Sequence, residues 1–181
     1  SAYIGALGAA LGTMVANLSS HKRGWDSKWN YYSKIAEKGQ NHLNNLLELV
    51  DKDTEAFNDI INSFRLPNNT KEEKLFRDNA IFNATLNAIK VPLKIMQESE
   101  SSMEIIRIMA NEGNPNSVSD AGVAALCARS AVIGGYLNVK INCKDLSDKK
   151  LAKSLISEAE KIKKSAEKKE KEIINITLKK L

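Results

Sequence analysis

Apolar residues recur every three or four positions along nearly the whole chain, which is the spacing of one helix face. The same spacing predicts five helices, at about 2–18, 28–65, 71–111, 119–141 and 148–180, and it requires no strand. Long helices joined by short turns predict an all-α, up-and-down bundle that forms a single domain over residues 1–181. The clearest apolar stripe lies within 28–65 and consists of Leu43, Leu46, Leu47, Val50, Phe57, Ile60, Ile61 and Phe64.

The predicted third helix has a well-marked start and an unusual interior. Thr70 and Glu73 have the spacing of a capping box and follow a turn at 66–69. Pro92 lies inside the helix, where its missing N–H group and its ring are expected to kink or divide the helix.

Asp53 is an acidic residue on the apolar face of the predicted second helix. It lies three residues after Val50 and four before Phe57, so it shares their face, whereas Asp51 and Asp59 do not. A carboxylate on such a face is costly unless it is paired, hydrogen-bonded or protonated, which makes Asp53 a candidate for function. An ion pair with a Lys or Arg from another helix explains the position equally well.

A polar, turn-forming segment at 113–124 leads directly into the predicted fourth helix. Asn114 and Pro115 mark a turn, because the residue before a proline avoids the helical region. Asp120 follows in the first helical turn, where the positive end of the helix dipole favours its ionised form. A simple capping role for Ser119 or Asp120 explains the spacing equally well.

The predicted first and fourth helices are rich in small residues. Each interior glycine costs about 1 kcal/mol of helix propensity, so a helix that keeps several is expected to be approached closely. We therefore expect these two helices to pack tightly against each other or to border a flat ligand. Their glycines are Gly5, Gly8, Gly12, Gly122, Gly134 and Gly135.

Length and composition limit the class of protein. A chain of 181 residues with 43% hydrophobic residues is long enough for one domain with a hydrophobic core. No apolar run approaches the roughly 20 residues of a membrane span, and 1–18 lacks the basic leader of a signal peptide, so no membrane association is expected. Cys127 and Cys143 have no histidine at metal-ligand spacing, which predicts reduced thiols, no metal site and a cytoplasmic protein.

The net charge of +5 arises entirely from the last predicted helix. Residues 148–181 hold 11 Lys against 6 Asp plus Glu, whereas the preceding residues hold 16 charges of each sign. The lysines alternate with acids, and neither arginine clusters nor interleaved aromatic residues accompany them. A solvated face is therefore expected rather than a nucleic-acid site.

Six segments, in this order, resemble the cyclodeaminase domain of formiminotransferase-cyclodeaminase and its stand-alone relatives, which include methenyltetrahydrofolate cyclohydrolases. The resemblance covers nearly the whole chain. No single segment would suffice, because small-residue helices and polar helix starts are common. The segments are 8–15 (GAALGTMV), 53–57 (DTEAF), 65–70 (RLPNNT), 91–93 (VPL), 113–124 (GNPNSVSDAGVA) and 138–142 (NVKIN).

The resemblance implies an all-α, dimeric enzyme that acts on a tetrahydrofolate one-carbon derivative, with or without a polyglutamate tail, and that needs no cofactor besides this substrate. In the cyclodeaminase reaction, the second folate nitrogen attacks the formimino carbon, ammonia leaves and 5,10-methenyltetrahydrofolate forms. The attacking nitrogen loses a proton and the leaving amine gains one, and a carboxyl group among apolar side chains can transfer such protons at neutral pH. Asp53 matches the family's catalytic acid, and we assign it this proton-shuttle role.

Other candidate site residues follow from the same resemblance. Asp120 would hold the cationic pterin side of the substrate or stabilise positive charge on the one-carbon unit. Lys22 and Arg23 are candidates for the glutamate carboxylates of the substrate, although solvation is the ordinary role of a loop lysine. For Asn138 and Asn142, a buried structural hydrogen bond is an equal alternative to substrate binding. The candidates for hydrogen bonds to the pterin are Asn114, Asn116, Ser117, Ser119, Asn138 and Asn142.

The chain departs from the family pattern at its beginning. Family members carry an extra helix and a Pro-Gly-Gly-Gly loop ahead of the serine that corresponds to Ser1, which is a further candidate substrate-binding residue. If that loop is absent from the protein, its backbone N–H contacts to the substrate are lost, and activity is expected to suffer.

Three hypotheses about function follow. The first is formiminotetrahydrofolate cyclodeaminase, and the second is methenyltetrahydrofolate cyclohydrolase, which uses water to open the same methenyl centre. The third is a non-catalytic helical scaffold, which predicts that Asp53 is paired in a salt bridge and that no cleft opens between the first helix and Asp120.

Overall fold

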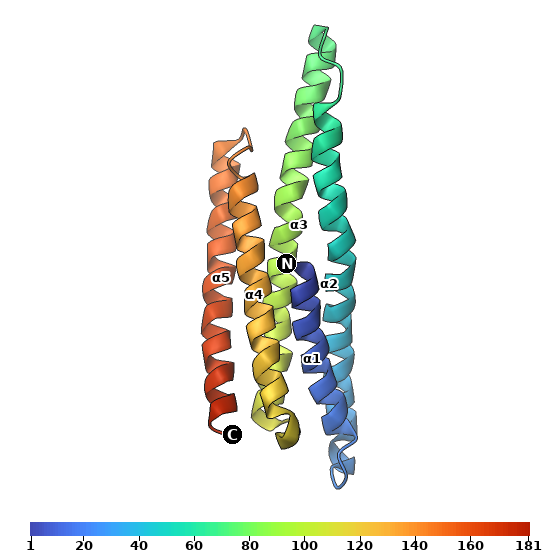
Figure 1. Ribbon diagram of the computed structural model, residues 1–181, viewed down its shortest axis with the longest axis vertical. Helices are drawn as coiled ribbons and strands as arrows, with labels where there is room; N and C mark the ends of the chain where they lie inside the picture. The colour runs from blue at the N-terminus through green and yellow to red at the C-terminus, as the bar shows by residue number, and fades with distance from the viewer.

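The computed structural model describes residues 1–181 and contains helices only. All five helices predicted from the spacing are present, with bounds within a few residues of those expected, so the all-α prediction is confirmed. Successive long helices run in alternating directions (Figure 1), as in an up-and-down bundle. In chain order the elements are α1 (Ala2–Ser20), η1 (Asp26–Lys28), α2 (Trp29–Phe64), α3 (Lys71–Glu112), η2 (Pro115–Ser117), α4 (Val118–Asn142) and α5 (Lys149–Leu178).

The short helix α1 lies against three longer ones. It packs on α2, α3 and α4, whereas α5 packs on α3 and α4. Figure 1 shows that α1 begins about halfway along α2 and that the α2–α3 hairpin extends well beyond it. The upper half of α2 therefore faces α3 and α4 without α1 between them.

Glycines allow α1 and α4 to approach closely, as expected from their small residues. A Cβ atom added to Gly8 would lie 2.9 Å from the carbonyl oxygen of Ala124 and 3.0 Å from the backbone nitrogen of Ala128. Gly135 has the same function between α4 and α3, because its Cβ would lie 2.9 Å from the carbonyl oxygen of Pro92. The tight-packing alternative of the sequence analysis is confirmed.

Helix α3 begins as predicted but does not divide at its proline. Thr70 and Glu73 form a reciprocal capping box, in which the Thr70 hydroxyl accepts from the Glu73 N–H. Pro92 is buried and lies within an unbroken helix, so the expectation that it divides the helix is wrong. A proline at this position leaves the carbonyl of Ala88 without its helical donor. The side chain of Asn142 in α4 donates a hydrogen bond of 2.7 Å to that carbonyl and so replaces the N–H donor that Pro92 cannot provide.

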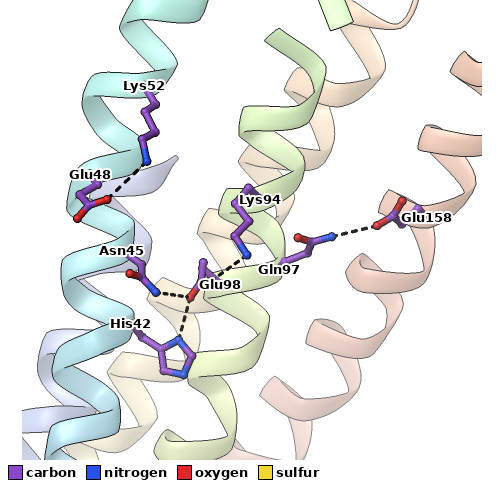
Figure 2. Close-up of polar contacts among 8 residues, drawn as sticks. All are labelled: His42, Asn45, Glu48, Lys52, Lys94, Gln97, Glu98 and Glu158. Carbon is purple, nitrogen blue, oxygen red and sulfur yellow. Dashed lines mark hydrogen bonds and ion pairs between the residues drawn. The ribbon is translucent and has the colours of Figure 1, made fainter. Parts of the chain in front are cut away.

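Polar side chains of α2 gather around Glu98 of α3 (Figure 2). The imidazole Nδ1 of His42 lies 3.0 Å from Glu98 Oε2, and the ammonium of Lys94 lies 3.2 Å from Glu98 Oε1. Asn45 also donates to Glu98 Oε2, at 3.4 Å. Burial favours the neutral acid, but the hydrogen bonds from these three side chains outweigh it and hold the pKa of Glu98 below its ordinary value.

Helix α5 attaches to the bundle through its acids and buried apolar residues. Glu158 accepts a hydrogen bond from Gln97, which Figure 2 also shows, and Glu170 and Glu172 pair with Arg129 and Arg107. These three acids of α5 therefore face α3 and α4.

Two segments are long and apolar enough to cross a membrane by length and composition. They are Ala2–Ser20 and Pro115–Asn142, and this differs from the sequence-based expectation that no segment reaches that limit. The most apolar 18-residue stretch of Ala2–Ser20 is 56% buried in the bundle, and that of Pro115–Asn142 is 44% buried. Core helices of a bundle have the same composition.

Candidate functional site

Asp53 lines a cavity of about 340 Å³ formed by three helices. The carboxyl group is half-buried and has no ion-pair or hydrogen-bond partner in the chain. A structural pairing of Asp53 with a Lys or Arg is therefore excluded in this structure. The other residues that line the cavity are Thr54, Ala56, Phe57 and Ile60 of α2, Ala88 of α3, and Asn138 and Asn142 of α4.

Two amides of α4 share this cavity with Asp53. Asn138 and Asn142 lie one helical turn apart and are both half-buried. Asn142 uses its amide nitrogen for the carbonyl of Ala88, which confirms the structural hydrogen bond considered for it, while Asn138 has no partner in the chain. Sequence reasoning thus selected three residues from two distant segments that the fold brings to one cavity.

Two small residues and one aromatic ring shape the cavity. Ala56 and Ala88 are buried and too small to fill the space between the helices. Phe57, one turn after Asp53, is 61% exposed, so its ring is available to a planar ligand. Sequence reasoning placed Phe57 in the apolar stripe but did not assign it to a site; its spacing of four residues from Asp53 was the available signal.

Ser1 lies next to this cavity without lining it. A Cβ added to Gly134 would lie 2.5 Å from the Ser1 hydroxyl, and Gly134 is one helical turn before Asn138. The start of α1 therefore borders the end of α4 that carries Asn138 and Asn142.

The polar segment before α4 lies at the N-terminal end of that helix, away from Asn138 and Asn142. The Asn114 side chain caps the short η2 turn by accepting from the Asn116 N–H, and the backbone N–H of Asn114 donates to the Ser19 hydroxyl at 2.8 Å. Helix α4 begins at Val118, so Ser119 and Asp120 lie inside its first turn and neither is the cap. The capping explanation is wrong, because Asn114 turns the chain before these residues are reached.

The remaining residues of this segment differ in exposure. Ser117 is buried at the N-cap position without a side-chain cap hydrogen bond, Ser119 is exposed and Asp120 is half-buried. Placement of Asp120 in the first helical turn is confirmed.

The basic loop after α1 also lies at the end of the bundle where α4 begins. The Lys22 ammonium lies 4.1 Å from the centre of the Trp25 ring, and Arg23 is exposed. Trp25 in turn stacks on Tyr32 at 5.6 Å between ring centroids. Lys22 is thus held against an aromatic surface, which is a more ordered position than that of a solvated loop lysine.

One chain does not bring Asp53 and Asp120 together. Asp120 and Asn138 lie 18 residues apart in one helix, which corresponds to about 27 Å along its axis. Asp120 also lines none of the main cavities. Of the two properties expected for a scaffold, the ion pair of Asp53 is not observed, whereas no main cavity reaches Asp120.

The remaining side chains offer neither a cluster of metal ligands nor an activated thiol. No three side chains of His, Cys, Asp or Glu gather at metal-ligand distance. Cys127 and Cys143 are free, and burial raises the pKa of both thiols, which disfavours the thiolate needed by a nucleophile. The cavity instead offers a carboxyl group, an unpartnered amide and an aromatic ring, a set suited to proton transfer on a planar polar substrate.

Comparison with known proteins agrees with this description. The sequence profile of formiminotransferase-cyclodeaminase matches residues 1–161. The chain belongs to this family. The methenyltetrahydrofolate cyclohydrolase of Methylorubrum extorquens is 35% identical over 160 residues, which cover 88% of this chain and 77% of that protein.

Two further proteins that the chain resembles differ in the share of their length that it covers. The formimidoyltransferase-cyclodeaminase of Rattus norvegicus is 33% identical over 148 residues, but the chain spans only 27% of that protein. The crystal structure of formiminotetrahydrofolate cyclodeaminase from Thermotoga maritima has a TM-score of 0.85 and 25% sequence identity, and the match covers 98% of this chain and 85% of that one. The chain is therefore a folate one-carbon enzyme of the cyclodeaminase or cyclohydrolase type.

Proposed function

We propose that the chain is a formiminotetrahydrofolate cyclodeaminase whose reaction takes place in the Asp53 cavity. The observation that carries this proposal is the position of Asp53, which lines one cavity with Asn138 and Asn142 and has no protein partner for its carboxyl group. The solved relative named for this reaction has nearly the same extent as the chain.

Asp53 transfers the protons in this proposal. The second folate nitrogen attacks the formimino carbon and gives up its proton, a bond forms between them, and the bond from that carbon to the amine breaks. The formimino group starts as a protonated amidinium. Asp53 accepts the proton from the attacking nitrogen and returns it to the departing amine, which then holds three protons and leaves as ammonia, while the positive charge stays on the methenyl product. The product is 5,10-methenyltetrahydrofolate, and the step requires no cofactor besides the substrate.

The cavity fits one end of a folate. Ligand sites commonly measure about 300–1,000 Å³, so 340 Å³ suits the fused ring and its reacting carbon while the benzoyl-glutamate part extends outside. We propose Asn138 and Asn142 as hydrogen-bonding groups for the pterin, with Ser1 beside them. Lys22 and Arg23 remain candidates for the glutamate or polyglutamate carboxylates, and Asn114, Asn116, Ser117 and Ser119 for further polar contacts.

Methenyltetrahydrofolate cyclohydrolase is the second candidate. It is favoured by the 35% identity to a relative of that name, of which the chain covers 77%. In this reaction, water attacks the methenyl carbon, one carbon–nitrogen bond opens, and formyltetrahydrofolate and a proton are released. The same acid can accept the proton from the attacking water.

We also propose that the chain acts as a homodimer through α1. This helix contains no charged residue, yet Tyr3, Leu7 and Leu18 are 71%, 50% and 45% exposed on its outer side. A second copy with the same uncharged face can cover these side chains without placing like charges against each other in the interface. A cytoplasmic location is proposed from the two free cysteines.

The absorbance of methenyltetrahydrofolate distinguishes the two reactions. We would mix the protein separately with 5-formiminotetrahydrofolate and with 5,10-methenyltetrahydrofolate and compare each with buffer. Formation of the methenyl chromophore with release of ammonia identifies the cyclodeaminase. Accelerated loss of the chromophore with formyltetrahydrofolate as product identifies the cyclohydrolase, and no effect in either mixture contradicts both.

A further inference from the structure

Pro92 of α3 affects a hydrogen bond between α3 and α4 at the wall of the Asp53 cavity. Pro92 has no N–H group, so the carbonyl of Ala88, four residues earlier, has no donor within its own helix. The amide nitrogen of Asn142 donates to that carbonyl at 2.7 Å. Ala88 and Asn142 both line the cavity, so this hydrogen bond forms part of its wall.

The close approach of α4 to α3 makes this hydrogen bond possible. Gly135 lies seven residues before Asn142, on the same side of α4. A Cβ added to Gly135 would lie 2.9 Å from the carbonyl oxygen of Pro92 and 2.6 Å from Met96 Cγ. A larger residue would separate the helices at this level and move the Asn142 amide away from Ala88.

The hydrogen bond to a carbonyl also fixes the orientation of the Asn142 amide. An asparagine side chain has a donor side and an acceptor side, and only the amino group can donate to the oxygen of Ala88. The carbonyl oxygen Oδ1 of Asn142 then accepts no hydrogen bond from the chain and remains an acceptor for a ligand in the cavity.

We infer that Pro92 is a positioning residue for the folate site, because the carbonyl that it leaves free at Ala88 holds the Asn142 amide with its oxygen available to an N–H group of the pterin. This inference rests on the proposed function of the cavity. An interior proline destabilises a helix, and here the cost is offset by a defined acceptor in the site.

The test is a double-mutant cycle with Pro92→Ala, Asn142→Ala and the double variant, with Pro67→Ala as control for a proline in an exposed turn. Urea unfolding gives stability, and equilibrium dialysis against 5,10-methenyltetrahydrofolate gives affinity. In Pro92→Ala the N–H of residue 92 satisfies Ala88 directly, so we expect unchanged or higher stability together with a binding constant weaker by about tenfold, the loss of one good hydrogen bond.

The stability part of the cycle tests the coupling without any ligand. We expect Asn142→Ala to lower the folding equilibrium constant by about tenfold when residue 92 is Pro, because the partly buried carbonyl of Ala88 is left without a donor in the chain. When residue 92 is Ala, the same change is expected to have little effect. Equal losses in both backgrounds would overturn the inference.

Affinity separates a positioning residue from a structural one. Coupling in stability with no change of affinity in Pro92→Ala would show that the hydrogen bond only holds the helices together, and the inference would be overturned. If the wild-type protein does not bind the folate, the proposed function fails, and the inference, which rests on it, fails with it. If the wild-type protein and the Pro92→Ala variant bind the folate equally tightly, the inference is overturned while the proposed function stands.

Discussion

Asp53 of α2 and Asn138 of α4 line the same cavity, and neither side chain has a hydrogen-bond partner in the chain. Polar groups that are partly removed from water and left unpaired in a cavity cost stability, which a ligand with complementary groups recovers. The pair comes from segments that are far apart in sequence and from two different helices. Such an arrangement favours a site built for a polar ligand over a helical scaffold.

The first prediction concerns the separation of Asp53 and Asp120. Because the two acids lie at opposite ends of the bundle, a shared role requires a second copy of the chain. We expect Asp53→Asn and Asp120→Asn to be inactive alone, and an equal mixture, after exchange of subunits, to recover about a quarter of the wild-type turnover, as expected for sites shared across a two-fold interface. No recovery after verified exchange would assign Asp120 a role within its own chain.

The second prediction concerns the contact between α1 and α4. Gly8→Ala places a methyl group against the backbone of Ala124 and Ala128, which cannot move without shifting a helix. The expected loss is about 1–2 kcal/mol in free energy of unfolding, since overpacking outweighs the gain in helix propensity.

Gly12→Ala is the matched control in α1. Its Cβ would lie 2.9 Å from Ile106 Cγ1, which belongs to a side chain rather than to a backbone. We expect a smaller loss than for Gly8→Ala in urea unfolding. Equal stability of Gly8→Ala and the wild-type protein would contradict the close contact between α1 and α4.

The third prediction concerns pH. The pKa of Glu98 is lowered in the folded chain, so its ionised form adds stability that is complete above the ordinary carboxyl value of 4.5 and is lost as the pH falls through the lower folded value. Glu98→Gln removes this contribution at all pH values. The variant is therefore expected to be less stable than wild type by about 1 kcal/mol at neutral pH and to approach it in acid.

Urea unfolding at about pH 7 and about pH 3 measures this difference. Glu48→Gln provides the control, because Glu48 is an exposed residue of α2 that pairs only with Lys52. A gap between Glu98→Gln and wild type that stays constant with pH would show that the contacts of Glu98 with His42 and Lys94 do not depend on its charge.

The fourth prediction concerns assembly. Leu7→Glu introduces a charge into the exposed, otherwise uncharged face of α1, and each copy in a two-fold dimer would bring one such charge to the interface. We expect the wild-type protein to have the mass of a dimer in light scattering at micromolar concentration and the variant that of a monomer. Leu178→Glu, at a more exposed apolar position in α5, is expected to leave the dimer intact. A monomeric wild-type protein would contradict this assembly.

The helices could be predicted from the sequence because their apolar positions follow a helical repeat over many turns. The effect of Pro92 could not, because the donor that replaces its missing hydrogen bond comes from Asn142, and only the packed structure places that side chain beside Ala88. Local spacing describes one helix, whereas this interaction depends on how two helices meet.

The candidate site was predictable only in part for a related reason. The face of α2 that carries Asp53 followed from its spacing to Val50 and Phe57, and its cavity partners Asn138 and Asn142 were already candidates. The sequence did not show which end of α4 lies beside Asp53. That end carries Asn138, whereas Asp120 starts the helix at the far end.

The most direct test is the turnover of Asp53→Asn with the substrate on which the wild-type protein acts. The absorbance of methenyltetrahydrofolate measures this turnover. The change keeps the volume of the side chain and removes its ability to transfer a proton, so we expect a loss of about 10²–10⁴-fold in kcat with the helical content unchanged. Asp51→Asn, an exposed acid on another side of α2, is expected to keep wild-type turnover. A wild-type rate in Asp53→Asn would contradict the assignment of this cavity as the reaction site.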